Sequence, residues 1–233
     1  MKKFSLLIVI ALSLLTLSSC LKDNDDYPDL NYPAVSLFNF YPKNTGVLYA
    51  VNGNLLNSFT PAYRGVSFFY AIPGNKKLQV IDRSNNNAII DTTLTFADSV
   101  VYSCMVYGTE TEPEFIRVPD VEIENAGTKT GVRFFHLANG VGKVNFKIGD
   151  QEITGSTNRS KENPSTLAQT QIFRPANSGK TSVTVTDDKG TVLGKIDEVE
   201  LKNTEHYNFM LIGTKGDSEY PLELRYSIYT ITD

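Results

Sequence analysis

Short segments in which apolar and polar residues alternate recur along this chain of 233 residues. Residues 144–148 (VNFKI) and 183–187 (VTVTD) show the pattern, and Gly, Asn, Asp or Pro bound such segments. A period of two in segments rich in Val, Ile, Phe and Tyr is typical of β-strands that bury one face. No segment keeps a helical period over about ten residues. The pattern therefore predicts an all-β fold.

The strand-like segments occur twice, in the same order. Residues 35–40 resemble residues 132–137 at an offset of 97 positions, and residues 102–109 resemble residues 207–214 at an offset of 105. The change of offset predicts an insertion in the second copy, which we place in the polar stretch 155–164. The sequence thus predicts two tandem copies of one β module.

Turn signals separate the predicted strands. Asn52-Gly53 is a strong hairpin signal, because a type I′ turn needs two residues that tolerate positive φ, and Gly149-Asp150 takes its place in the second copy. Several short strands per module, with a turn signal every 8 to 12 residues, predict a β-sandwich. Antiparallel sheets with one solvated face would produce the observed alternation.

Three motifs of the repeated unit point to a known family. They are Arg133-Phe134-Phe135-His136-Leu137, the hairpin VLYAVNG at 47–53 and the segment IPGNKKLQV at 72–80. Their order resembles the family known as domain of unknown function 4397, which is common in surface proteins of Bacteroidetes. The resemblance implies immunoglobulin-like or transthyretin-like sandwiches and no established activity. The first copy departs from it by carrying Asn39 where the second has His136.

The N-terminus predicts export and lipidation. Lys2 and Lys3 precede an apolar run at 4–17 that is shorter than the roughly 20 residues of a membrane-spanning helix, as in a secretory signal peptide. Leu17, Ser18, Ser19 and Cys20 then resemble the lipobox of bacterial lipoproteins, in which the chain is cut before a Cys that becomes acylated. The alternative is an ordinary secreted protein with a chance Cys.

An acidic segment follows the predicted lipidation site. Lys22, Asp23, Asn24, Asp25 and Asp26 resemble the export signal that directs Bacteroidetes lipoproteins to the outer face of the outer membrane. The alternative is a solvated acidic linker, because charge runs are usually solvated.

The predicted organisation has five parts. Residues 1–19 are the signal peptide, 20–32 the lipidated Cys and tether, 33–119 the first β-sandwich, 120–130 a linker and 131–233 the second β-sandwich. The predicted location is the outer membrane, through the N-terminal lipid and facing the cell exterior. The formal net charge of −4 excludes the basic footprint that nucleic-acid binding requires.

Two histidines are the first candidates for chemistry. His136 lies on a predicted strand and is expected to be a hydrogen-bonded structural residue, and His206 is expected to be exposed at a strand start. The chain contains no G-x-S-x-G, H-E-x-x-H, paired C-x-x-C or P-loop motif. A hydrolase site between the domains, around His136 and acidic loops, is a disfavoured alternative.

The other candidate residues are one cysteine and a group of acidic loop residues, and each could have a structural or a functional role. Cys104 alternates in phase with Tyr102 and Val106, which predicts a core position rather than a reactive thiol. The loop residues Glu110, Glu112 and Glu114, and Asp217 and Glu219 in the equivalent loop, are expected to be solvated rather than to bind Ca²⁺.

The run Phe68-Phe69-Tyr70 must expose at least one ring if it is a strand, and an exposed ring could stack on a sugar or contact a partner. The triplets Asp91-Thr92-Thr93 and Asp98-Ser99-Val100 resemble the O-glycosylation sequon of Bacteroidetes.

The sequence predicts a non-catalytic surface lipoprotein that serves as a binding, adhesion or accessory module. Its partner, a protein or a glycan, is not identified, and no cofactor or metal is predicted. One alternative is an accessory glycan- or nutrient-binding subunit of an outer-membrane uptake complex. The other is the hydrolase described above.

Overall fold

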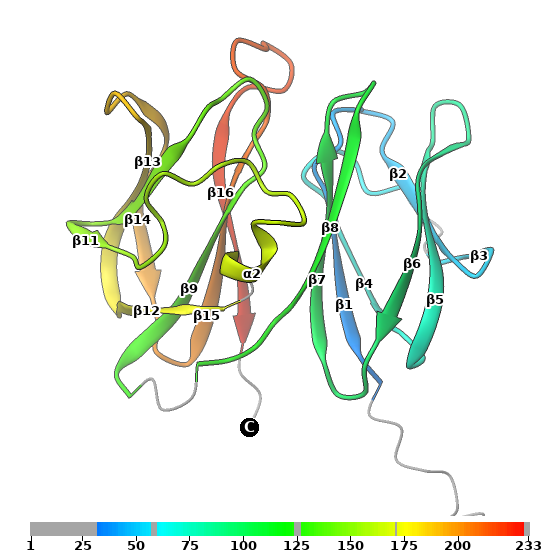
Figure 1. Cartoon of the computed structure of the whole chain (residues 1–233), viewed down its shortest axis with the longest axis horizontal. Helices are drawn as coiled ribbons and strands as arrows, with labels where there is room; N and C mark the ends of the chain where they lie inside the picture. The colour runs from blue at the N-terminus through cyan, green and yellow to red at the C-terminus, as the bar shows by residue number, and fades with distance from the viewer. Residues whose placement is uncertain (1–31, 57–59, 124–126, 171, 231–233) are drawn as a thin grey trace, which may run out of the picture. The chain divides into compact units, whose positions relative to one another are not determined.

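The computed structural model describes residues 32–56, 60–123, 127–170 and 172–230. Contacts group Tyr32–Asp233 into one compact unit. The described part of this unit contains four sheets of four strands each and one short helix, α2 (Leu167–Thr170) (Figure 1). The predicted all-β fold class is confirmed.

The first eight strands form two sheets. One has the order β4-β1-β7-β8 and the other the order β3-β2-β5-β6. Their bounds are β1 (Ala34–Asn39), β2 (Val47–Val51), β3 (Asn54–Leu55), β4 (Val66–Tyr70), β5 (Gly74–Asp82), β6 (Asn87–Phe96), β7 (Val101–Gly108) and β8 (Pro113–Pro119).

The last eight strands repeat this arrangement, with sheet orders β12-β9-β15-β16 and β11-β10-β13-β14. Adding eight to each strand number in the first two sheets gives the strand orders of the last two. The bounds are β9 (Lys129–His136), β10 (Val144–Ile148), β11 (Gln151–Glu152), β12 (Arg174–Asn177), β13 (Gly179–Asp187), β14 (Val192–Leu201), β15 (Glu205–Ile212) and β16 (Glu223–Thr230). The strand β9 begins two residues before the predicted start of the second sandwich.

The predicted antiparallel pairing needs one correction. Strand β1 pairs with β7 in parallel, and β9 pairs with β15 in parallel, while the other pairs are antiparallel. Parallel neighbours require a long crossover connection. Here the intervening strands, β2 to β6 and β10 to β14, provide it.

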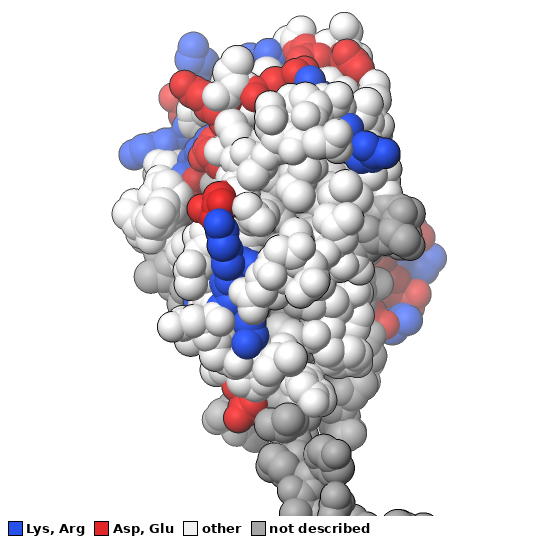
Figure 2. Space-filling model, turned by 90° about the vertical axis from the view of Figure 1, so that its right-hand side faces the viewer, with Lys and Arg blue, Asp and Glu red and all other residues white. Residues whose placement is uncertain are grey.

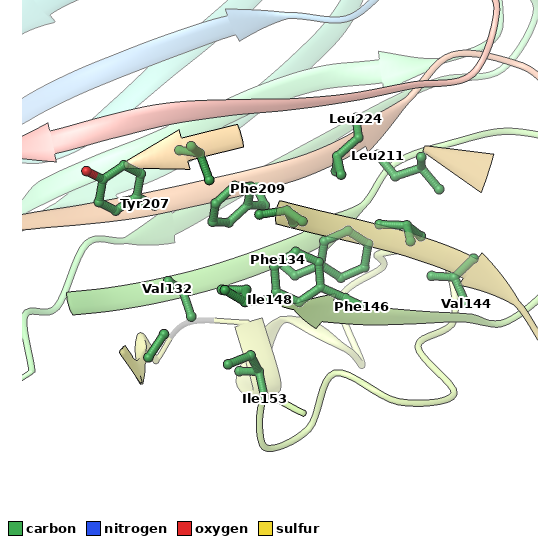
Figure 3. Close-up of a cluster of buried hydrophobic side chains, with 14 of the residues drawn as sticks. Val132, Phe134, Val144, Phe146, Ile148, Ile153, Tyr207, Phe209, Leu211 and Leu224 are labelled. Atoms are coloured by element: carbon green, nitrogen blue, oxygen red, sulfur yellow. The ribbon is translucent and has the colours of Figure 1, made fainter. Parts of the chain in front are cut away.

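Each set of eight strands encloses its own apolar core. In the second set the ring of Phe146 stacks on Phe134 with centroids 4.6 Å apart and lies 5.4 Å from Phe209 (Figure 3). In the first set Val35, Leu37, Tyr49, Leu78 and Cys104 are among the buried residues. Inward positions two residues apart on each strand build these cores, as the alternation predicts.

A third apolar cluster joins the two sets of strands. It contains Phe38, Met105 and Ile116 from the first set and Phe135 and Met210 from the second. The sheets β4-β1-β7-β8 and β12-β9-β15-β16 are therefore covered on both faces over much of their area. The predicted single solvated face is wrong for β7 and β15, whose residues after the first are all buried.

The first predicted turn follows the predicted chemistry. Asn52 (φ 50°) and Gly53 (φ 81°) join β2 to β3, with both residues at the positive φ that a type I′ turn needs. At the equivalent β10–β11 turn Gly149 has a positive φ (53°) but Asp150 does not, so this turn lacks the two positive φ values of a type I′ turn. The predicted insertion, residues 155–164, lies in the long connection between β11 and β12.

Candidate functional site

The edge strand β4 exposes a row of apolar side chains. Val66, Phe68, Tyr70 and the following Ile72 are 49%, 57%, 67% and 63% exposed. The rings of Phe68 and Tyr70 contact each other edge to face, with centroids 5.1 Å apart, while Phe69 packs on the core. The prediction that this run must expose an aromatic ring is confirmed, and we call residues 66, 68, 70 and 72 the β4 stripe.

The β4 stripe adjoins the apolar cluster that joins the two sets of strands. Val66 pairs with Phe38, which is buried in that cluster. Just before β4, Arg64 forms an ion pair with Glu223 (2.6 Å), and the ring of Tyr63 meets that of Tyr220 at 4.9 Å. The start of β4 is thus fixed by the second set of strands, and the stripe continues from there into solvent.

A buried polar network also joins the two sets of strands. Arg133 is 2% exposed and forms an ion pair with Asp120. The Ser103 hydroxyl donates to Asp120 (2.9 Å), and Arg133 Nε donates to Asn208 (2.9 Å). Burial raises the pKa of Asp120, while the Arg133 guanidinium opposes that shift. These side chains come from β7, β9, β15 and the segment after β8, so the network holds those elements in register.

The predicted insertion supplies a second network. Arg159 pairs with buried Glu162, whose carboxylate accepts the backbone N–H of His136 (3.3 Å). The Tyr107 hydroxyl donates to the Glu162 carbonyl at 2.8 Å, and Lys161 forms an ion pair with Glu114. Because Tyr107 and Glu114 belong to β7 and β8, the insertion ties the second set of strands to the first.

His136 has the predicted structural role. Its side chain is fully buried, and its Nε2 lies 3.0 Å from the Gly142 carbonyl oxygen. At the equivalent position Asn39 donates to the Pro61 carbonyl (2.8 Å) and accepts the N–H of Tyr41 (3.0 Å). In both sets a buried polar side chain thus holds a neighbouring loop. A hydrolase site around His136 would need an access path to a residue that has no exposed surface.

The expected exposure of His206 is wrong, because this residue is 1% exposed. Its Nε2 accepts the N–H of Ile123 at 3.2 Å, and its ring packs edge-on against Phe173. The parallel register places His206 beside Gly131, where any Cβ would overlap the imidazole ring. A strand-pairing partner without a side chain makes room for the ring, and sequence spacing cannot reveal that partner.

We expect the H136N variant to fold and to lose part of the acid sensitivity of the chain. Burial lowers the pKa of His136, so below its ordinary pKa of about 6.5 the unfolded chain binds a proton that the folded chain does not. The free energy of unfolding therefore falls with decreasing pH, by at most about 1.4 kcal/mol per pH unit for one histidine. Urea denaturation between pH 7.5 and 5.5 measures the slope.

Asn is a matched replacement because Asn39 occupies the equivalent buried position. His206, whose pKa is also lowered by burial, remains in the variant and still contributes to the change in the free energy of unfolding with pH. Equal slopes for H136N and the parent chain would contradict this account.

The other candidate residues have structural or solvated positions. Cys104 is buried in the core, as predicted, and burial raises the pKa of its thiol. Glu110 forms an ion pair with Lys43 (2.8 Å), and Glu219 accepts a hydrogen bond from Asn44 (2.6 Å). Within the described ranges, no group of three or more His, Cys, Asp or Glu side chains is placed to hold a metal ion.

The sequon-like triplets lie at or near the surface. Thr92, which follows Asp91 on β6, is half-buried, while Ser99, which follows Asp98 in the turn before β7, is exposed. Figure 2 shows the side on which β3, β5 and β6 lie in Figure 1. Charged side chains gather at its upper end, and a row of basic side chains with an acidic group above it runs down the middle, left of the centre. The Lys77–Asp91 ion pair between β5 and β6 measures 3.0 Å.

The predicted lipidation and export residues lie outside the described residues. These are Leu17, Ser18, Ser19, Cys20, Lys22, Asp23, Asp25 and Asp26. Among the residues that the structure does describe, no helix is long and apolar enough to cross a membrane.

Comparison with known families gives one match. Residues 33–147 match the model of the family described as "Domain of unknown function (DUF4397)". The match begins where the first sandwich is predicted to begin and ends within β10, so it includes strands from all four sheets. It supports the resemblance stated above. No curated protein matches the chain.

Solved structures match the chain at low identity and with low TM-scores. A family 26 carbohydrate-binding module of Eubacterium rectale Amy13K, in complex with maltoheptaose, is 14% identical, with a TM-score of 0.27 and coverage of 86% of this chain and 98% of that one. A proposed cell adhesion protein of Bacteroides ovatus is 11% identical, with a TM-score of 0.26 and coverage of 87% and 99%. A DUF3823 family protein of the same species is 10% identical, with a TM-score of 0.23 and coverage of 73% and 98%. TM-scores of this size support no inference about function.

Proposed function

We propose that this chain, which carries a DUF4397 match over residues 33–147, is a lipid-anchored surface protein that acts as a non-catalytic binding or adhesion module. The observation that carries the proposal is the β4 stripe, a row of apolar side chains in solvent on a fold whose histidines and single described cysteine are buried. Exposed apolar residues that form a contiguous patch mark contact surfaces. The stripe is therefore the contact surface of the module.

The two sets of strands are two copies of one module in this proposal. The identical strand orders and the two parallel pairs, β1 with β7 and β9 with β15, support a duplication. The buried networks around Arg133 and Glu162 would make the two copies a rigid unit, because neither network is complete within one set of strands. A rigid unit presents the β4 stripe in a fixed orientation.

The β4 stripe gives the first test of the proposal. The segment from residue 21 onward, which contains the compact unit Tyr32–Asp233, is assayed against glycans, extracellular-matrix proteins, outer-membrane proteins and immobilised copies of itself. We expect F68S/Y70S to weaken binding at least about tenfold, because the aromatic contact area is lost. V192S, at an exposed apolar residue on β14, is the matched control. Absence of any binding by the unmodified chain, or equal binding by F68S/Y70S, would contradict the proposal.

The lipid anchor gives a second test. We propose that Cys20 is acylated and that residues 20–32 tether the module to the outer membrane, facing the cell exterior. The support is the order of basic residues, apolar run and L-S-S-C in the sequence, and multiple acyl chains give stable anchoring. C20S is expected to abolish palmitate labelling and to release the chain from the membrane fraction. C104A, at the buried core cysteine, should leave both unchanged, and membrane-bound, labelled C20S would refute the assignment.

A further inference from the structure

The β4 strand differs from the other sheet edges that the structure describes. Natural proteins protect exposed edge strands with charges, prolines or short length. Among the other edges, β3 and β11 have two residues each, and β6, β8, β12, β14 and β16 each contain a charged residue or a proline. Strand β4 has the sequence VSFFY, and no charged residue occurs between Gly65 and Pro73. It is thus an edge without the usual protection against pairing with another strand.

The free backbone groups of β4 belong to the residues of the stripe. On the inner side, Gly65 accepts the N–H of Asn39 and Ala71 donates to Pro33, each at 2.8 Å. Backbone polar groups alternate in direction along a strand, so residues 65, 67, 69 and 71 face β1. The N–H and C=O groups of Val66, Phe68 and Tyr70 therefore face the open edge.

We propose that β4 pairs antiparallel with β4 of a second copy of this chain, with Phe68 on the two-fold axis. This deepens the proposed function, because it names the partner of the β4 stripe. In this register Phe68 faces its own counterpart, and Val66 faces Tyr70 of the other copy. Each such pair exchanges both N–H···O bonds. The two four-stranded sheets become one continuous sheet through an isologous contact.

The stripe is self-complementary in this register. The pairs that β4 itself forms, Phe68 with Phe68 and Val66 with Tyr70, each join two apolar side chains, which is the arrangement that stabilises adjacent strands, and no like charges oppose each other. The stripe also continues the apolar cluster that contains Phe38, so pairing extends an apolar contact that already exists within the chain.

Charge substitutions test the register directly. The chain from residue 21 onward is examined by sedimentation velocity over a concentration series. We expect the unmodified chain to dimerise. V66K/Y70K sets lysine against lysine in both outer pairs and should weaken dimerisation at least about tenfold, while V66K/Y70E sets lysine against glutamate and should restore most of it. Both positions are exposed, so circular dichroism and thermal melting should show the same fold in each variant.

The V192K variant is the control, since it adds one lysine to an exposed apolar position on β14, and it should dimerise as the unmodified chain does. A monomeric unmodified chain at all concentrations, or equal weakening by V66K/Y70K and V66K/Y70E, would overturn the proposal. The two proposals fail separately. If the unmodified chain is monomeric but F68S/Y70S abolishes binding to a glycan or another protein, the result supports the proposed function and rejects the proposed dimer.

Discussion

Replacing Asp120 with alanine is expected to lower the free energy of unfolding by about 3–5 kcal/mol. Arg133 would remain buried with its ion-pair partner removed, and an unpaired buried charge is among the most destabilising changes in a protein. The Ser103 hydroxyl would also lose its acceptor. Urea denaturation of D120A and of the unmodified chain at pH 7.5 measures the difference.

Two further variants make this result specific. E198A breaks the Lys180–Glu198 ion pair, whose side chains are 67% and 66% exposed, and exposed pairs contribute at most about 1 kcal/mol. The double variant D120L/R133M removes both buried charges and should recover most of the stability lost in D120A. A loss in D120A no larger than that in E198A would show that the network around Arg133 does not hold the two sets of strands together.

The second large effect is expected at Phe146, in the core of the second set of strands. F146A should destabilise the chain by about 3–5 kcal/mol, because it removes a fully buried ring and leaves a cavity between Phe134 and Phe209. L55A changes an exposed residue on β3 and should alter stability by no more than about 0.5 kcal/mol. Thermal and urea denaturation provide the values, and similar losses in the two variants would contradict this description of the core.

The sequence predicted the features that depend on local chemistry. The in-phase position of Cys104 predicted its burial, since alternate residues of a strand share one face. Asn52-Gly53 predicted the β2–β3 turn, because its backbone needs two positive φ values. The run Phe68-Phe69-Tyr70 predicted an exposed ring for the same reason of alternation.

The features that depend on which sheets meet were not predictable from these patterns. Strand β7 is covered on both faces because the second set of strands packs on its outer side. His206 is buried because Gly131, 75 residues earlier, is its parallel neighbour. Arg133 was part of a family-like motif, but its partner Asp120 lies in the predicted linker. Such pairings depend on sheet order and on contacts between sheets, which strand periodicity does not encode.

The sequence alone determined that the chain is all-β, that the Asn52-Gly53 turn joins two strands, and that an alternate residue such as Cys104 faces a core. Each of these follows from alternation and turn chemistry within a few residues. Only the tertiary structure decided that β1 and β7 pair in parallel, that the two sets of strands share an apolar cluster and two buried polar networks, and that β4 is an uncharged open edge. The reason is physical: coverage of a sheet face and exposure of a strand edge are fixed by packing between segments far apart in the chain.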